Sequence, residues 1–377
     1  MVRAGIRLRH TMVAALALAL ALTGCTDRGT TTVVPGAAQP GQVQTVYVAT
    51  TRQTNDSGWF GPGRSASTSY AQLHVAVPKQ RQIGQLRAGF TRVNPKRQFA
   101  ITARNTLKHR QQFLASLAAD LAKLPRQQRD ITLYIHGYNN SYLEGTYRTA
   151  QLAHDFALPG LAVHYAWPSA ASPLGYTYDR DSVLFARDGL EQLLRDLRKT
   201  GAQRVVVVAH SMGAMLTIET LRQIEIANSG WSKRHLDGVI LIAPDLDIEV
   251  FQSQMARFNS LPAPFAIFVS SRDRALQLSA RINGSAVRLG SLEAVEKLGQ
   301  YPVTIIDVSA FSSLSDGGHF TVGSSPVLIE LLGRSQELNR AFETDRAGRA
   351  GLLPGTVITV QKATQLILSP HLASTAN

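Results

Sequence analysis

Arg204-Val205-Val206-Val207-Val208-Ala209-His210-Ser211-Met212-Gly213 joins an apolar run to a turn of small residues around one serine. The next residues, 214–219, have helical character, so the segment predicts a strand, a sharp turn and a helix. In the G-x-S-x-G pattern such a turn lifts the serine hydroxyl above a sheet, because small flanking residues let the backbone fold tightly. Ala209 stands where the pattern has its first glycine, and its methyl group weakens the match without breaking it. Ser211 is a candidate nucleophile, with capping of the following helix as the structural alternative.

Apolar runs and helical segments alternate around this turn. The expected strands are 131–135, 161–166, 204–208, 238–243, 264–270 and 303–308, and the expected helices are 143–157, 180–199, 212–227, 248–258, 274–283 and one beginning near Val322. Near-continuous apolar strands separated by helices predict the α/β class, with a doubly wound, mostly parallel sheet covered on both faces. Only about twenty residues separate 243 from the next strand, so we expect no large cap domain. The loop 167–181 is long enough to wall a pocket instead.

Three more segments precede the alternating part. Strands are expected at 45–51 and 73–77, with a glycine-rich loop holding Trp59, Phe60 and Arg64 between them. A helix is expected from about Leu107 to Leu124, where apolar residues recur at helical spacing. The α/β domain is therefore expected to span 45–334, followed by a tail, 335–377, whose structure is uncertain apart from a strand-like run at 356–360.

The amino terminus has the pattern of a secretory signal. Three arginines precede a short apolar stretch, 12–22, which is too short to span a bilayer stably. It ends in Leu22-Thr23-Gly24-Cys25, which resembles the lipobox of bacterial lipoproteins, and Cys25 is the chain's single cysteine. We expect a signal peptide over 1–24, lipidation at Cys25 and a flexible tether over 25–44, since several acyl chains on one residue give a durable membrane anchor. Thr26 favours the outer membrane of a bacterial envelope, by resemblance to a sorting rule for such proteins.

Composition and charge limit the classes of partner. The chain has 377 residues, 44% of them hydrophobic and 17% charged, as in ordinary globular proteins. Its net charge is +13, or +10 once the three arginines of the signal are removed. The basic residues are dispersed, which favours a solubilising surface over attraction to anionic lipid or envelope polymers, and nucleic-acid binding is not expected. Neither H-E-x-x-H nor a cysteine cluster occurs, so no metal or cofactor is expected, and the oligomeric state cannot be predicted.

A serine hydroxyl needs a histidine to take its proton and a carboxylate to orient that histidine. Asp273 follows the strand 264–270, and His319 follows the next strand after a polar loop. Both positions lie at carboxyl ends of expected strands, where parallel sheets place their sites. Asp245 and Asp247 are competing acids, and Asp273 alternatively caps the helix after it. Alternatively, His319 is a loop histidine with no catalytic role.

Acyl transfer also needs backbone N–H groups aimed at the developing oxyanion. Met212 follows the nucleophile at the start of its helix, and Tyr138 follows the His136-Gly137 turn after the strand 131–135. These two amides are the expected donors, with His136 expected to hold the loop by hydrogen bonds rather than to act as a base. A purely structural turn is the alternative. The possible pocket residues are His136, Asn139, Trp167, Tyr176, His210 and Asp245.

Several segments together carry a family resemblance. They are His136 to Asn140, Ala166-Trp167-Pro168-Ser169, Gly175-Tyr176-Thr177-Tyr178-Asp179, Ala209 to Gly213, Ala243-Pro244-Asp245 and the early Tyr47-Val48-Ala49-Thr50-Thr51-Arg52. The chain resembles the α/β-hydrolase superfamily, and within it a bacterial branch catalogued as a domain of unknown function, over about residues 45–333. The resemblance implies a serine hydrolase with Ser211 as nucleophile, Asp273 as acid, His319 as base and Tyr138 and Met212 as oxyanion donors. It implies no particular substrate.

We therefore expect a carboxylester hydrolase tethered to the envelope, acting through an acyl-enzyme on Ser211. Small or amphiphilic esters are the expected substrates, because the sequence leaves no room for a large lid. An acyltransferase that uses the same acyl-enzyme is one alternative. A non-catalytic envelope binding protein on the same scaffold is another, since a fold does not by itself give a function.

Overall fold

The computed structural model describes residues 31–37, 42–89, 93–284, 287–311, 318–333, 355–360 and 363–368. The expected signal, Cys25 and most of the tail lie outside these residues. Within the described part no helix combines the length and the apolar character needed to cross a membrane.

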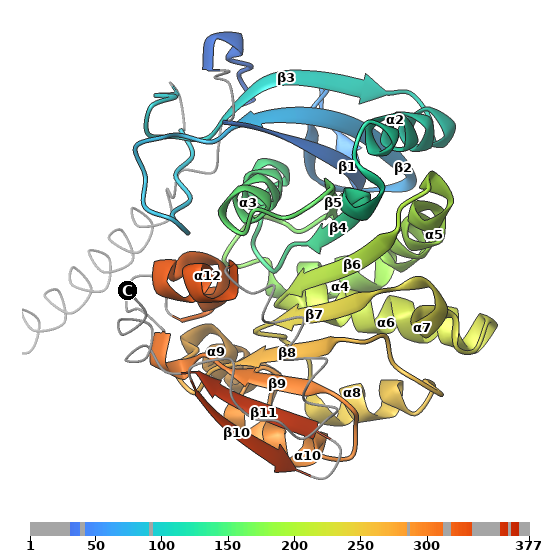
Figure 1. The fold of residues 1–377 in the computed structure, drawn as a ribbon, viewed down its shortest axis with the longest axis vertical. Helices are drawn as coiled ribbons and strands as arrows, with labels where there is room; N and C mark the ends of the chain where they lie inside the picture. Colours follow the sequence, from blue (N-terminus) through green and yellow to red (C-terminus); the bar gives the residue numbers. More distant parts are fainter. Residues whose placement is uncertain are drawn as a thin grey trace, which may run out of the picture.

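One sheet of eleven strands organises the described part of the chain, in the order β10-β11-β9-β8-β7-β6-β4-β5-β1-β2-β3 (Figure 1). The strands are β1 (Val43–Thr54), β2 (Phe60–Ala76), β3 (Ala100–Leu107), β4 (Asp130–Ile135), β5 (Leu161–Ala166), β6 (Arg204–His210), β7 (Gly238–Ile242), β8 (Phe265–Val269), β9 (Thr304–Asp307), β10 (Gly355–Val360) and β11 (Ala363–Leu368). The seven pairings from β1 through β9 to β11 are parallel, and β1–β2, β2–β3 and β10–β11 are antiparallel. The predicted doubly wound, mostly parallel sheet is confirmed.

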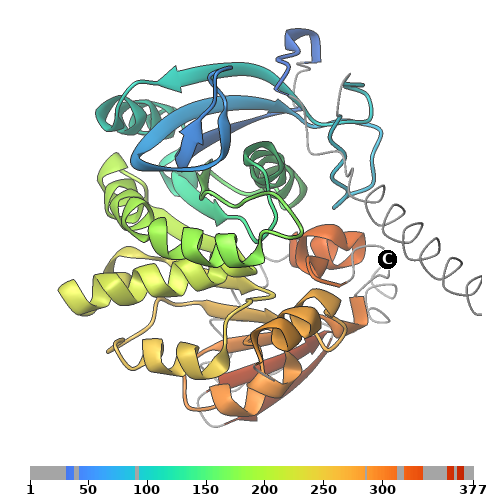
Figure 2. The same ribbon diagram turned by 180° about the vertical axis from the view of Figure 1, so that it is seen from behind.

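Helices cover both faces of this sheet. They are α2 (Arg110–Ala122), α3 (Tyr142–Asp155), α4 (Tyr176–Phe185), α5 (Arg187–Leu197), α6 (Met212–Ala227), α7 (Trp231–His235), α8 (Ile248–Met255), α9 (Arg274–Asn283), α10 (Val295–Leu298), α11 (Thr321–Ser324) and α12 (Pro326–Gly333), with short 3-10 turns at Pro35–Ala37, Arg126–Gln128, Arg198–Thr200, Leu292–Ala294 and Ser309–Phe311. Figure 1 shows α3 and α12 in front of the sheet, and Figure 2 shows α4 and its neighbours on the other face.

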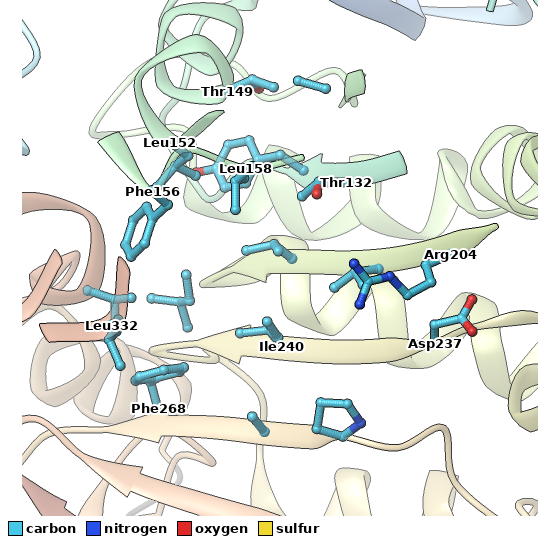
Figure 3. A pocket seen from close by; sticks show the side chains of 18 of the residues that line it. Thr132, Thr149, Leu152, Phe156, Leu158, Arg204, Asp237, Ile240, Phe268 and Leu332 are labelled. Atoms are coloured by element: carbon cyan, nitrogen blue, oxygen red, sulfur yellow. The ribbon is translucent and has the colours of Figure 1, made fainter. Parts of the chain in front are cut away.

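The core follows this division into faces. A single large cluster of buried side chains joins α2, α5, α6 and α8 to one face. On the other face, α3 packs over β1 to β3, and α12 packs over β7 to β9. Between α3 and α12 this second face carries an apolar groove of about 290 Å³, lined by β4, β6, β7 and β8 and shown in Figure 3. Ser211, Asp273 and His319 are not among its lining residues, so the groove is separate from the candidate site.

The early part of the chain differs from the prediction in two places. The glycine-rich loop expected around Phe60 and Arg64 belongs to β2, a strand of 17 residues whose pairing with β1 shifts register near Arg52. Register shifts of this kind let a glycine-containing segment stay paired in a bent ribbon. The helix expected from Leu107 begins at Arg110, because His109 caps it and the residues before it form β3.

Two further differences concern helices and the tail. The single helix expected at 180–199 is divided at Ala186, which ends α4 and precedes α5. The Tyr165 hydroxyl of β5 donates a hydrogen bond to the Ala186 carbonyl oxygen at 2.7 Å. A side chain of the sheet therefore satisfies a backbone acceptor where the helix is interrupted. In the tail, β10 and β11 form a hairpin that extends the sheet beyond β9, so the sheet includes residues after 334.

Candidate active site

Ser211 occupies a strained turn between β6 and α6. Its backbone has φ 53° and ψ −123°, a conformation that non-glycine residues rarely adopt. A Cβ atom on Gly213 would lie 2.4 Å from the His136 carbonyl oxygen, so only glycine fits where α6 approaches β4 this closely. Ala209 is fully buried within β6 and pairs with Ile135 and Leu241, so its methyl group sits in ordinary strand backbone. The turn therefore has the geometry of a nucleophile elbow despite the missing first glycine.

The Ser211 side chain does not cap α6, because no side-chain capping bond is made at that position. Its Oγ instead lies 2.9 Å from His319 Nε2. The other ring nitrogen, His319 Nδ1, lies 2.8 Å from Asp273 Oδ2. The histidine side chain keeps 21% of its surface exposed, whereas the carboxylate keeps 1%. The structure thus joins the three side chains in one hydrogen-bonded chain that is open to solvent at the histidine.

Asp273 has two partners at once. Its Oδ1 accepts from the Leu276 amide at 3.0 Å and caps α9, while Oδ2 is the oxygen next to His319. The capping alternative for this residue is therefore real, and it is compatible with the second contact because a carboxylate has two oxygens. The cap also fixes the rotation of the carboxylate, which directs the second oxygen at the imidazole.

The competing acids have other partners. Asp247 caps α8 by accepting from the Glu249 and Val250 amides. Asp245 is buried in a polar cluster, where Ser279 Oγ donates to it at 2.6 Å and Arg288 Nε lies 3.4 Å away. Neither of these acids is the partner of His319.

The loop after β4 lies beside the elbow. A Cβ atom on Gly137 would lie 2.9 Å from Ser211 Cβ, so glycine brings the loop backbone against the serine. Tyr138 is the next residue, and its hydroxyl donates to the Pro173 carbonyl. On the other side, Met212 begins α6, whose first amides have no acceptor within the helix and lie at the positive end of its dipole. Both residues expected as oxyanion donors thus come from segments that flank Ser211.

The side chains of His136 and Trp167 pack together beneath the loop after β4. Their rings stack with centroids 4.9 Å apart, and both residues are fully buried. His136 Nε2 lies 3.1 Å from the Trp167 carbonyl oxygen, and Trp167 Nε1 donates to the His136 carbonyl at 2.7 Å. Burial lowers the pKa of His136 to about 3, so the imidazole stays neutral. The expectation that these two residues line a pocket is wrong, because they support the site from behind.

Two of the other residues expected at the pocket contact Tyr138 and His319. Tyr176 stacks edge-on against Tyr138 at 5.4 Å, and its hydroxyl donates to Asp245. His210 lies against His319, with ring centroids 4.7 Å apart, and its Nε2 is 3.1 Å from the His319 carbonyl oxygen. Burial lowers the pKa of His210 well below its ordinary value, so no second positive charge develops beside His319.

A buried arginine of β1 ties the loop after β4 to this strand. Arg52, at 1% exposure, donates to the Asn140 carbonyl at 2.7 Å and to the Ser169 carbonyl at 3.0 Å. Burial lowers its pKa to about 10, which leaves the guanidinium charged at neutral pH. Asp179, also fully buried, completes this framework by accepting from Ser169 Oγ at 2.6 Å and from the Asn139 amide at 3.1 Å. Asn139 itself has φ 57°, so the loop is held in a strained conformation.

Residues 110–335 match the family described as alpha/beta hydrolase of unknown function (DUF900). The chain belongs to this family. The search of curated proteins finds no match. Among solved structures, an esterase of Pyrococcus furiosus is 15% identical with a TM-score of 0.31, over 59% of this chain and 83% of that one. An esterase domain of a Rhodothermus marinus protein is 13% identical with a TM-score of 0.31, over 78% and 99%. Carboxyl esterase 2 of the fungus Tuber melanosporum is 11% identical with a TM-score of 0.31, over 75% and 71%.

In this α/β hydrolase the sequence did not reveal the positions of Arg52 and Asp179 at the site. Both belong to segments that carry the family resemblance, but their contacts join residues up to 117 positions apart. Within the described residues no group of three or more His, Cys, Asp or Glu side chains could hold a metal ion.

Proposed function

We propose that this α/β hydrolase is a serine carboxylester hydrolase that is anchored to the bacterial envelope through lipidated Cys25. The observation that carries the proposal is the hydrogen-bonded chain from Asp273 through His319 to Ser211, at 2.8 and 2.9 Å, on a strained elbow. If Ser211 only capped a helix, or His319 were only a loop residue, the two side chains would not need to be aligned with Asp273 in one series of hydrogen bonds. The resemblance of residues 22–25 to a lipobox supports the anchor.

The proposed reaction proceeds in two halves. Ser211 Oγ attacks the ester carbonyl carbon while His319 Nε2 takes its proton, and Asp273 stabilises the imidazolium. The amides of Met212 and Tyr138 donate to the resulting oxyanion. The C–O bond to the leaving alcohol then breaks, and the alcohol takes the proton from His319. Water, activated by the same histidine, hydrolyses the acyl group from Ser211.

Open access to His319 and the short connection between β7 and β8 favour small or amphiphilic esters. That connection contains one helix of eight residues, α8, which is too little chain for a large lid. A strong preference for emulsified long-chain triglyceride over soluble esters would contradict this part of the proposal.

Labelling with a fluorophosphonate tests the activated serine. Every described element lies after residue 30, so a chain that begins at Thr26 keeps the whole described fold. We expect this chain to be labelled, and Ser211→Ala and His319→Ala to lose the label. Ser67→Ala, at an exposed serine of β2, is the matched control and should be labelled like the parent. A well-folded parent that takes no label, or a label that survives Ser211→Ala, would contradict the mechanism.

The anchor needs its own test. In cells given an alkyne-tagged palmitate, we expect the full chain to incorporate the tag and Cys25→Ala to lose it. Incorporation that persists in Cys25→Ala would overturn the lipidation proposal and leave the hydrolase proposal intact.

A further inference from the structure

The outer face of α9 exposes apolar side chains beside the candidate site. Leu278 and Ile282 each keep 58% of their surface exposed. They are four residues apart, so they form one stripe on the helix. The inner face of α9 is buried through Leu276 and Ser279, and the helix begins at the Asp273 cap. Figure 2 shows α9 on the near side of the sheet in that view.

A third apolar side chain lies on a neighbouring segment. Leu174, in the loop before α4, is 96% exposed. The start of α4, directly after this loop, is tied to α9, because the Tyr176 hydroxyl lies 2.9 Å from Ser279 Oγ and accepts from Asn283 Nδ2 at 2.8 Å. The same loop contacts Tyr138 through the Pro173 carbonyl. Single exposed leucines are ordinary on protein surfaces, but here the apolar residues lie on two linked segments next to the site.

The charged side chains on α9 itself are all basic, although Glu293 lines a small depression together with Gln277 and Ala280 of this helix. Arg274 and Arg281 lie on the same side of α9 as Leu278, at spacings of four and three residues. Arg272 precedes the helix, and α9 itself contains no acidic residue. All three arginines are exposed, and none makes an ion pair with a residue that the structure describes. An apolar stripe flanked by unpaired arginines is suited to an interface between water and anionic lipid.

We propose that Leu174, Leu278 and Ile282, with Arg274 and Arg281, form a docking face for an anionic lipid surface. The apolar side chains enter the boundary between headgroups and acyl chains, and the arginines bind lipid phosphates. Docking through this face brings α9, which Asp273 caps, against the lipid surface. The inference goes beyond the proposed ester hydrolysis, and it holds or fails independently of it.

Co-sedimentation with vesicles tests the docking face, using the chain that begins at Thr26 so that no acyl chain contributes. We expect binding to vesicles of equal phosphatidylglycerol and phosphatidylcholine, and at least tenfold weaker binding to phosphatidylcholine alone. Leu278→Asp with Ile282→Asp should weaken the first binding at least tenfold. Arg274→Gln with Arg281→Gln should weaken it roughly 25-fold, since each arginine near an anionic surface contributes about 1 kcal/mol.

Two control variants distinguish binding through this face from nonspecific hydrophobic or electrostatic binding. Ile226→Asp changes an isoleucine of α6 that is 56% exposed, and Arg126→Gln changes an exposed arginine remote from α9. Both should bind like the parent, and circular dichroism should show every variant folded. The proposal is overturned if the parent chain does not bind anionic vesicles. It is also overturned if Ile226→Asp weakens binding as much as Leu278→Asp with Ile282→Asp. A parent that ignores vesicles but forms dimers broken by Leu278→Asp would show that a second copy covers this face instead.

Discussion

At the scale of single residues, Asp273 serves both the imidazole and a helix. Asp273→Asn keeps an oxygen for the Leu276 amide, because asparagine is a good N-cap, but loses the charge that faces His319. We expect kcat for ester hydrolysis to fall about 10⁴-fold while the free energy of unfolding changes little. Asp273→Ala should add a loss of about 1 kcal/mol in stability.

Asp247→Ala is the matched control for this pair. It removes the same kind of cap from α8 and has no contact with His319. Urea unfolding should show a stability loss like that of Asp273→Ala, and initial rates should show no comparable loss of kcat. Equal rates for Asp273→Asn and the parent would exclude the carboxylate from the reaction.

Gly213 is a second residue with a sharp expectation. An added Cβ would meet the carbonyl oxygens of His136 and Ile135 at 2.4 and 2.6 Å, and backbone cannot move aside as a flexible side chain can. Gly213→Ala should destabilise the fold by about 1–3 kcal/mol, in line with other overpacked sites. Gly36→Ala, where nothing lies within 4 Å, should change the melting temperature little. A Gly213→Ala variant as stable as the parent would show that α6 can shift away from β4.

At the scale of elements, the loop after β4 depends on a residue of β1. Arg52 donates to carbonyl oxygens of both Asn140 and Ser169, and its planar fork fits this arrangement. Arg52→Lys keeps the charge but not the fork, so the loop with the Tyr138 amide should lose its fixed position. We expect kcat to fall about 10²-fold with KM nearly unchanged, as when one oxyanion donor is lost.

A transition-state analogue distinguishes this positioning role from a general loss of stability. A boronic acid that forms a tetrahedral adduct with Ser211 should lose affinity in Arg52→Lys by a factor similar to the loss in kcat. A ground-state ester analogue should bind as before. Parallel loss of both affinities would indicate that Arg52 merely supports the fold.

Elements with strong local signals could be predicted from the sequence, and those that depend on partners could not. Strand 161–166 and helices 212–227 and 274–283 have the predicted bounds, because each has a continuous apolar pattern and a clear end. Strand β3 was missed because Ala100–Leu107 contains only two large apolar residues, Ile101 and Leu107, and gains its pairing from β2. The meeting of Ser211, Asp273 and His319 could be expected because each follows an expected strand, whereas the place of Arg52 rests on contacts across 88 and 117 residues.

At the scale of the whole molecule, buried histidines set the response to acid. Burial lowers the pKa of His136 to about 3 and lowers those of His164 and His210 well below the ordinary value of 6.5. Below pH 6.5 the unfolded chain takes up protons at these sites and the folded chain does not. Stability should therefore fall as pH drops, by about 1.4 kcal/mol per histidine between pH 7.5 and 5.5.

Urea unfolding at the two pH values measures this loss. Replacing His164 with Phe should reduce the pH dependence by about the share of one histidine. Stability that is the same at pH 5.5 and 7.5 would show that the buried rings accept protons in the folded state.

The position of Arg52 also limits how far the chain can be shortened from its amino-terminal side. Similarity to the family begins at residue 110, after β1, β2 and β3 have been completed. A fragment cloned at that boundary would leave the edge of β5 bare and leave the Asn140 and Ser169 carbonyls without their cation. We expect such a fragment to be insoluble or inactive when it is expressed. The shortest fragment that keeps the described sheet around the site therefore begins no later than Val43, the first residue of β1.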